Sequence, residues 1–224
     1  MNLALRLKLL IILAAAGSTS ALATTVVFND FGPGNSYNTA QGYAVGGSGS
    51  YTGYYAVDMP FTSNGNFTLA QIDVSFVGDG PSAESPITLS LDSDNGGNPG
   101  SVLMSWTLNN FPLFGTCCTV ETVTPSSTIQ LSAATQYWLT AAPTNSTTST
   151  DEAWSLNDTG ATGTRKYQTA PGGPYQSASG PLSAFDVLAN SPAPEPASLG
   201  IALGGLGLLA AALLRQRISR TTRT

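Results

Sequence analysis

The chain contains no histidine, which restricts the chemistry available to it. Ser-His-Asp and Cys-His catalytic arrangements need an imidazole, and so do zinc sites with histidine ligands. An enzyme of this composition would have to rely on carboxylates, as glycosidases do when one group is protonated and its partner is ionised. Before the C-terminal region the glutamates are Glu84, Glu121 and Glu152, and none has a setting that marks a tuned pair. We therefore expect no catalytic function, with a carboxylate-based glycan hydrolase as the last alternative.

The two cysteines, Cys117 and Cys118, are adjacent. Two thiols in an oxidising compartment tend to form a disulfide. Neighbouring Cα atoms on a trans peptide lie ~3.8 Å apart, below the usual disulfide range of about 4.4–6.8 Å. The closed loop is minimal, so the bond would remove little entropy from the unfolded chain and would mainly stiffen the local turn. A vicinal disulfide is one prediction, and free or mixed thiols and intermolecular links are the alternatives.

The segment Asp92–Gly100, with the sequence DSDNGGNPG, admits two interpretations. Carboxylates at alternate positions followed by glycine resemble part of a calcium loop, with Asp92, Asp94 and Asn95 as candidate ligands. The EF-hand pattern also needs a glutamate at its twelfth position, where this chain has Leu103. The other interpretation, which we favour, is a tight hairpin turn in which Asn and Gly adopt positive φ. Calcium is the one cofactor that the sequence suggests.

Aromatic side chains offer flat surfaces with a polar edge, on which sugar rings can stack. Five tyrosines cluster early in the chain and three tryptophans fall in apparent strands: Tyr37, Tyr43, Tyr51, Tyr54 and Tyr55, and Trp106, Trp138 and Trp154. Tryptophans in strands usually belong to the core, but Trp138 alternates with Tyr137 and Leu139, so one of these two faces must meet solvent or a second interface. A carbohydrate-binding module is therefore an alternative function.

The elements that position these residues show a period of two, which is typical of half-buried strands. The alternating residues are Ile72, Val74 and Phe76; Ile87, Leu89 and Leu91; Val102, Met104, Trp106 and Leu108; Tyr137 and Leu139; Trp154 and Leu156; and Phe185 and Val187. Short strands separated by turn-forming residues predict an antiparallel β-sandwich of jelly-roll or Ig-like type. On such a strand the neighbours Asp151 and Glu152 would point to opposite faces.

Three stretches lack this alternation, and we expect them to be connections. Residues 32–51 are rich in Gly, Ser and Asn and predict a long loop over one edge of the sandwich. Residues 143–150 predict a surface loop, and residues 159–180 an extended connection.

The domain predicted between residues 24 and 189 is strongly acidic. It carries two basic residues, Arg165 and Lys166, and twelve acidic ones, for a net charge of −10. Counterion release from phosphates requires clustered Lys and Arg, so nucleic-acid binding is excluded. A domain of this length can bury a sizeable core without disulfide or metal staples.

Residues 1–23 have the pattern of a secretory signal peptide. Arg6 and Lys8 form a positive region, residues 9–16 an apolar stretch, and Ala21-Leu22-Ala23 an A-x-A site with cleavage expected after Ala23. The sequence therefore predicts export through the secretion machinery.

The other end of the chain predicts a membrane tether. Residues 190–196 form a Pro-rich linker that ends in Pro194-Glu195-Pro196, and residues 197–214 contain neither a charge nor a proline. As a helix the latter would span ~27 Å, close to the ~30 Å hydrocarbon core of a bilayer. A buried core helix is the alternative, although such helices normally carry a polar face. Residues 215–224 carry four arginines as their only charges, which the positive-inside rule keeps in the cytoplasm.

This C-terminal arrangement resembles the PEP-CTERM sorting signal, in which a Pro-Glu-Pro motif, a short membrane helix and an Arg-rich end follow in this order. The resemblance implies recognition by exosortase, a membrane cysteine protease of Gram-negative and related bacteria that make exopolysaccharide. It also implies cleavage near Glu195 and transfer from the inner membrane to the cell surface or extracellular matrix. Pro194, Glu195 and Pro196 carry over as the recognition motif of a substrate, not as catalytic residues.

The domain itself resembles the choice-of-anchor R family. The likeness covers about residues 26–188 and depends on the turn 94–100, the Cys117-Cys118 pair and Tyr137-Trp138-Leu139 in an acidic, histidine-free β-domain. Domains of that family occur with different surface anchors, PEP-CTERM among them, and have no established activity, so no site residue carries over. We expect an exported protein with a structural or adhesive role in exopolysaccharide or biofilm.

Overall fold

The computed structural model describes residues 23–78, 85–149 and 151–191, and these form an all-β domain. Residues 1–22 of the predicted signal peptide, Glu84, the motif 194–196, the predicted membrane helix 197–214 and the tail 215–224 lie outside the described residues. Within the described part of the chain, no helix has the length and hydrophobicity that a bilayer crossing requires.

The strands of the described residues follow in chain order. They are β1 (Ala23–Asn29), β2 (Asn38–Gly46), β3 (Ala56–Thr62), β4 (Phe67–Val74), β5 (Phe76–Gly78), β6 (Ile87–Asp94), β7 (Pro99–Leu108), β8 (Glu121–Val123), β9 (Gln130–Leu131), β10 (Gln136–Pro143), β11 (Asp151–Leu156), β12 (Thr162–Gln168), β13 (Gln176–Pro181) and β14 (Phe185–Ser191). They belong to one compact unit, Thr24–Ser191.

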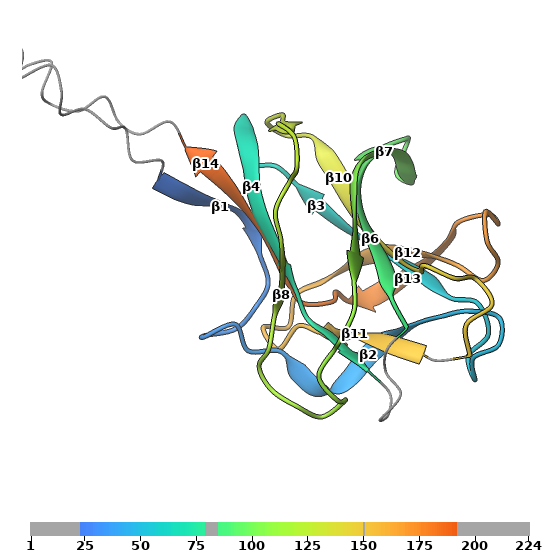
Figure 1. Ribbon diagram of the computed structural model, residues 1–224. Coiled ribbons are helices and arrows are strands. Elements are labelled where there is room, and N and C mark those ends of the chain that lie inside the picture. Colours follow the sequence, from blue (N-terminus) through green and yellow to red (C-terminus); the bar gives the residue numbers. More distant parts are fainter. Residues whose placement is uncertain (1–22, 79–84, 150, 192–224) are drawn as a thin grey trace, which may run out of the picture. The chain divides into compact units, whose positions relative to one another are not determined.

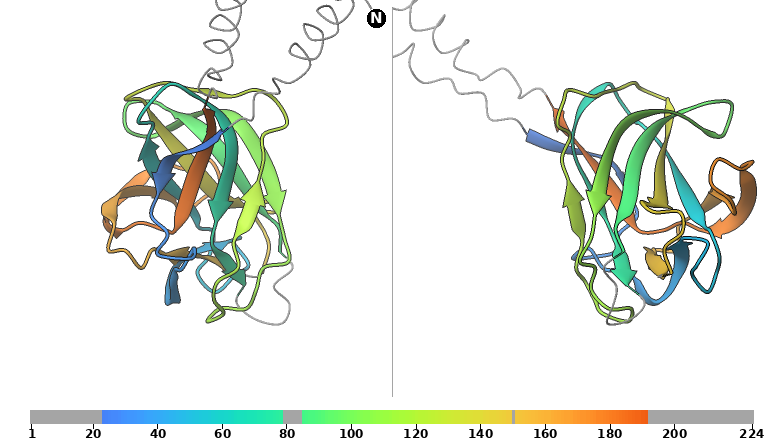
Figure 2. Two further views of the ribbon diagram at one scale, coloured as in Figure 1. Left: turned by 90° about the vertical axis from the view of Figure 1, so that its left-hand side faces the viewer. Right: turned by 45° about the vertical axis from the view of Figure 1, so that its right-hand side comes forward.

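The strands build three antiparallel sheets in a sandwich-like arrangement (Figure 1). A five-stranded sheet has the order β1-β14-β4-β8, with β9 also paired to β4, and a six-stranded sheet has the order β13-β12-β3-β10-β6-β7. The third sheet has the order β2-β11-β5, and in Figures 1 and 2 β2 and β11 lie at the end of the sandwich opposite the start of β1 and the end of β14.

The core lies between the five-stranded and six-stranded sheets. Its inward-facing residues include Ile72, Val74, Phe185 and Val187 from the first sheet, and Val57, Met59, Leu89, Leu91 and Leu139 from the second. The ring of Phe61 lies 6.2 Å from that of Phe185 and so connects the two sheets. Trp154 on β11 contacts Phe76 at 5.0 Å and Phe185 at 5.9 Å between ring centroids, so the third sheet joins the same core. The predicted all-β, antiparallel fold is confirmed at this level.

Two of the expected connections are wrong. Residues 32–51 contain β2, and residues 159–180 contain β12 and all of β13 except its last residue. These strands carry small or polar residues on one face and few apolar residues on the other. Their period-two pattern is therefore short, and their composition resembles that of a loop. In β2 only Tyr43 and Val45 turn apolar side chains towards the core, where Val45 is 1% exposed. The third connection is confirmed for residues 144–149, which contain no strand.

Val102 also departs from its predicted position. Leu91 pairs with Met104, but the next residue, Asp92, pairs with Val102, so an extra residue of β7 bulges between them. A β-bulge of this kind moves the following side chains to the other face of the sheet. Val102 is consequently 61% exposed, whereas Leu108 keeps its buried position.

Candidate functional site

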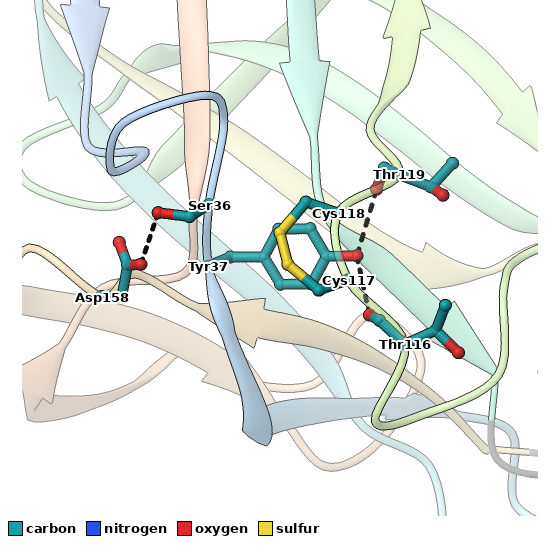
Figure 3. Close-up of a disulfide and its surroundings, with 7 residues drawn as sticks. All are labelled: Ser36, Tyr37, Thr116, Cys117, Cys118, Thr119 and Asp158. Atoms are coloured by element: carbon teal, nitrogen blue, oxygen red, sulfur yellow. Dashed lines mark hydrogen bonds between the residues drawn. A yellow bond between two sulfur atoms is a disulfide. The ribbon is translucent and has the colours of Figure 1, made fainter.

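The adjacent cysteines lie in an exposed loop between β7 and β8. In the structure Cys117 and Cys118 form a disulfide across a cis peptide bond, and their Cα atoms are 3.1 Å apart rather than the distance expected for a trans peptide. Both residues are exposed. Figure 3 shows the pair beside the ring of Tyr37, whose hydroxyl donates to the carbonyl oxygens of Thr116 and Thr119 at 3.1 and 3.3 Å. One tyrosine thus bonds the backbone on both sides of the cysteine pair. The thiol state in solution stays a prediction.

Tyr37 anchors this loop to a small core of its own. It is 3% exposed and packs with Phe31, Val77 and Ala184, while Val120 packs against the same cluster from the end of the loop. The neighbouring Ser36 is also fixed, because its hydroxyl donates to Asp158 at 2.6 Å. The loop therefore covers part of the outer face of the β2–β11–β5 sheet.

The first half of the loop places Phe114 on that face. The amide of Phe114 donates to the carbonyl of Gly78 at 2.9 Å, and the amide of Gly78 donates to the carbonyl of Pro112 at 2.8 Å. These bonds form a parallel bridge between Gly78 and Leu113 at the end of β5. Gly115 then turns the chain with a φ of 87°, a conformation that favours glycine. The Phe114 side chain remains 44% exposed, although hydrogen bonds to Gly78 hold the backbone at Pro112 and Phe114.

A groove lies beside Phe114 on the outer face of the β2–β11–β5 sheet. It consists of two adjoining hollows of about 200 and 550 Å³ that share Gly42 and Phe114 in their lining. The smaller hollow is lined by Gly42, Ala44, Tyr51, Thr52, Phe114, Asp151, Glu152 and Ala153. The larger is lined by Ala40, Gln41, Gly42, Phe114, Leu156 and Pro181. The lining thus combines small residues of β2 and β11 with the exposed aromatic residues Tyr51 and Phe114.

Two aspartates and a threonine form an acidic cluster on the six-stranded sheet. Thr140 Oγ1 on β10 lies 2.7 Å from Asp58 Oδ1 on β3 and 2.7 Å from Asp92 Oδ2 on β6. The two contacts are equally short, and a hydroxyl that donates its proton to one carboxylate can accept the second bond from a protonated carboxyl. Burial raises the pKa of Asp58 to about 7, and it raises the pKa of Asp92 as well. The cluster therefore holds a proton near neutral pH.

A second acidic cluster belongs to the five-stranded sheet. Asp30 Oδ1 accepts a hydrogen bond from the amide of Phe185 at 2.8 Å, and Asp186 follows directly on the same strand. Burial raises the pKa of Asp30 to about 7, and the nearby carboxyl of Asp186 contributes to the rise. Burial and the carboxyl of Asp73 raise the pKa of Asp186 to about 7 in the same way.

These paired carboxyl groups have perturbed pKa values of the kind that general acid–base catalysis uses. Each of them is nevertheless at most 6% exposed. A substrate would have to displace packed strands to reach them, so the arrangement serves to hold protons within the fold. The glutamates offer no better pair among the described residues, since Glu121 is half-buried on β8 and Glu152 is 1% exposed on the core side of β11.

The candidate calcium ligands lie at the β6–β7 hairpin. Asp92 belongs to the acidic cluster around Thr140, whereas Asp94 Oδ1 accepts hydrogen bonds from Trp138 Nε1 at 2.8 Å and Gln136 Nε2 at 2.9 Å. The hydrogen bond from Trp138 is the main cause that lowers the pKa of Asp94. Gly96 and Gly97 supply the positive φ of the turn, as the hairpin interpretation predicted, whereas Asn95 and Asn98 keep a negative φ and the prediction is wrong for them. The two aspartates thus have separate partners, and calcium binding stays a prediction.

The early tyrosines do not form one platform. Tyr43 donates to the carbonyl of Pro181 at 2.8 Å and stacks on Arg165, whose guanidinium carbon lies 3.7 Å from the ring centroid. Tyr55 stacks on Tyr167 at 5.2 Å. Tyr51 alone projects into solvent, with 99% of its side chain exposed.

The tryptophans occupy three different settings. Trp154 is a core residue, and half-buried Trp106 donates from Nε1 to the carbonyl of Thr124 at 2.8 Å. Trp138 lies on the face of the six-stranded sheet that points away from the core, yet it is only 2% exposed.

Comparison of the chain with protein-family models and with characterised proteins finds no match. Any functional conclusion therefore depends on the sequence signals and on the geometry described above.

Proposed function

We propose that this protein is exported and sorted to the cell surface or extracellular matrix, where its β-sandwich acts as a non-catalytic structural or adhesive module. The observation that carries the proposal is the order of features after the domain: Pro194-Glu195-Pro196, an uncharged apolar stretch, and a cluster of arginines. Exosortase would recognise this segment as a PEP-CTERM signal, cleave the chain near Glu195 and release the domain from an inner-membrane intermediate.

Features at the other end of the chain support export. Residues 1–23 fit a signal peptide with cleavage after Ala23, and the compact unit that follows begins at Thr24. A disulfide between Cys117 and Cys118 would also persist in the oxidising environment that exported proteins meet. Both targeting segments would therefore act on one acidic β-domain.

The domain's chemistry supports a binding or structural role. The chain has no histidine, and the carboxyl pairs of the described residues are buried rather than placed in an open cleft. A sandwich of the jelly-roll or Ig-like kind presents loops and sheet faces to partners without needing a catalytic centre. Exopolysaccharide is the partner that the resemblance to PEP-CTERM proteins implies, and the likeness to choice-of-anchor R domains agrees with a surface location.

A carbohydrate-binding module is the second candidate, and one observation favours it. The groove beside Phe114 is lined by two exposed aromatic rings, which is the kind of surface that sugar rings contact. Sorting and binding are separate properties, so each needs its own test.

The sorting proposal is tested by fractionation of a host with and without exosortase. We expect the chain in the surface or matrix fraction when the protease is present, with a new C-terminus near Glu195 by mass spectrometry. Without the protease we expect the uncut chain in the inner membrane. A matched variant in which Pro194, Glu195 and Pro196 are replaced by alanine should behave like the protease-free strain. Intact, freely soluble protein in the cytoplasm would contradict the proposal.

A further inference from the structure

We propose that the groove between Tyr51 and Phe114 binds a chain of neutral sugar residues. This inference rests on the proposed function in one respect, because surface sorting is what would bring the groove to a polysaccharide. The groove lies on the β2–β11–β5 sheet, and β2 and β11 stand at the end of the sandwich opposite the end of β14, where the tether would begin (Figures 1 and 2).

The walls of the smaller hollow are aromatic. Tyr51 is 99% exposed and Phe114 is 44% exposed, and both line the same hollow. A pyranose ring has an apolar face of C–H groups and an equatorial rim of hydroxyl groups, so its face can pack on an aromatic ring while its rim stays hydrated. Phe114 and Tyr51 are thus two such surfaces available at one hollow.

The floor of the hollow is flat because its residues are small. Gly42, Ala44 and Ala153 lie on the face of β2 and β11 that points away from the core, while their neighbours Tyr43, Val45 and Trp154 point inward. A longer side chain at any of the three floor positions would fill the space beside Phe114. The hollow of about 200 Å³ has room for a single sugar residue, and the adjoining hollow of about 550 Å³ extends the site along β2.

Fixed polar groups stand at the rim. Asp151 Oδ1 accepts a hydrogen bond from Thr52 Oγ1 at 2.5 Å, and Asp151 Oδ2 accepts one from the amide of Tyr51 at 3.1 Å. These bonds hold the carboxylate beside the exposed ring and leave it further lone pairs to accept from a ligand. Sugar hydroxyl groups are donors of the required kind, so an aromatic ring and an acceptor are offered side by side.

The charge of the groove selects among polysaccharides. Its described lining includes the outward-facing carboxylate of Asp151 and no Lys or Arg side chain. Uronic-acid polysaccharides, nucleic acids and anionic lipid surfaces would meet like charge there and in the acidic domain as a whole. A neutral glycan avoids this repulsion and still uses both the aromatic faces and the acceptor.

The groove is also organised before a ligand arrives. The two backbone bonds between Phe114, Gly78 and Pro112 fix the position of the Phe114 backbone, and Tyr37 holds the far side of the same loop. Little conformational entropy is then lost when a sugar ring packs on Phe114. Within this loop Phe114 is the contact residue, whereas Cys117 and Cys118 lie outside the lining of the groove and help to position it.

The test is affinity electrophoresis of the purified full chain, kept in solution with a polyoxyethylene detergent so that no sugar-based detergent competes. The gels contain hydroxyethylcellulose, dextran or soluble starch as neutral probes, or alginate as an anionic one. We expect retarded migration in at least one neutral gel and none in alginate. Phe114→Ala and Tyr51→Ala should each weaken binding by about tenfold, and Tyr175→Ala, which removes a 37% exposed ring outside the groove, should leave it unchanged.

The inference would be overturned by the absence of retardation in every neutral gel, by equal retardation in alginate, or by retardation that Phe114→Ala and Tyr51→Ala leave unchanged. Thermal melting of each variant confirms that it is folded. Concentration-dependent self-association lost in Phe114→Ala, without any glycan effect, would identify the groove as a contact between copies and would also overturn it. Fractionation of the same variants separates this inference from the proposed function, since normal sorting without glycan binding contradicts the inference alone.

Discussion

Asp186 on β14 lies directly opposite Asp73 on β4, and the two side chains are only 5% and 6% exposed. Asp73 Oδ1 accepts hydrogen bonds from Gln71 Nε2 at 2.9 Å and Thr122 Oγ1 at 2.5 Å, so Asp73 is the hydrogen-bond acceptor of the pair. Two ionised carboxylates directly opposite on antiparallel strands repel each other. Asp186 therefore keeps its proton in the fold, which agrees with the rise of its pKa to about 7 by burial and by Asp73.

The retained protons predict that the domain is most stable in acid. In the folded state the pKa values of Asp30, Asp58 and Asp186 are about 7, whereas the unfolded carboxyls ionise near 3.8. Between these values the unfolded state releases protons that the folded state keeps. The stabilisation that these retained protons add to the free energy of unfolding is complete below about pH 4. It is lost as the pH rises through about 7, by up to about 1.4 kcal/mol per pH unit for each group. Thermal melting from pH 4.5 to 8 should show a falling Tm.

A substitution tests whether Asp186 contributes to this slope. Asp186→Asn keeps the shape of the protonated carboxyl and cannot ionise, so the decline in Tm should become shallower by about a third. The variant should also be more stable than the parent protein at pH 8. Asp158→Asn supplies the control, because Asp158 is an exposed carboxyl. A Tm that is flat or rises across this range would show that the buried carboxyls are ionised in the fold.

The hydroxyl of Thr140 should stabilise the cluster that it bridges. Thr140→Val keeps the volume of the side chain but removes the hydroxyl that contacts both Asp58 Oδ1 and Asp92 Oδ2, leaving Asp92 Oδ2 only its bond from Ser90 Oγ at 3.2 Å. Leaving buried carboxyl groups without that partner should lower the free energy of unfolding by about 1–3 kcal/mol. Thr140→Ser retains the hydroxyl and should lose less. Urea denaturation of both variants at pH 7 decides, and equal stability of the two would show that the bridge contributes nothing.

The sequence predicted the strands whose two neighbouring faces differ strongly. The alternation of Ile72, Val74 and Phe76 marks β4 and β5, and that of Ile87, Leu89 and Leu91 marks β6. It failed for β2, β12 and β13, where small and polar residues face outward and the hydrophobic signal falls to one or two residues per strand. It also failed at Val102, because a bulge depends on the pairing between two strands and not on either strand alone.

The sites were harder to predict because they join residues far apart in the chain. Asp58 meets Asp92 through Thr140, and Asp73 meets Asp186, only after the register of the sheets is set. Asp73 lies between Ile72 and Val74, and Asp186 between Phe185 and Val187, so each occupies an ordinary polar position of the period-two pattern and gives no local sign of its burial. The groove had no local signal either, because nothing in the sequence shows that the backbone at Phe114 pairs with the end of β5.

The cysteine pair should matter to its loop far more than to the whole domain. The disulfide closes a minimal ring, so replacing both cysteines by serine should change the free energy of unfolding by less than about 1 kcal/mol. Amide exchange of residues 111–120 should nevertheless become faster. Mass spectrometry of non-reduced protein checks the pairing itself, and two alkylatable thiols in exported protein would contradict it. Tyr37→Phe is the matched variant, because it keeps the cysteines but removes the bonds to Thr116 and Thr119.

Asp94 should stabilise the β6–β7 hairpin as a hydrogen-bond acceptor, without calcium. Its carboxylate accepts from Trp138 Nε1 and Gln136 Nε2, and also from the amide of Gly97 at 3.1 Å. Asp94→Asn would turn one acceptor oxygen into a donor facing these N–H groups. Because the side chain is exposed to water, we expect a loss of only about 1 kcal/mol, together with a red shift of Trp138 fluorescence. Millimolar calcium should leave the Tm of the parent protein unchanged, since the N–H donors already occupy the oxygens that a cation would need. A calcium-dependent rise in Tm that Asp94→Asn abolishes would instead establish Asp94 as a ligand.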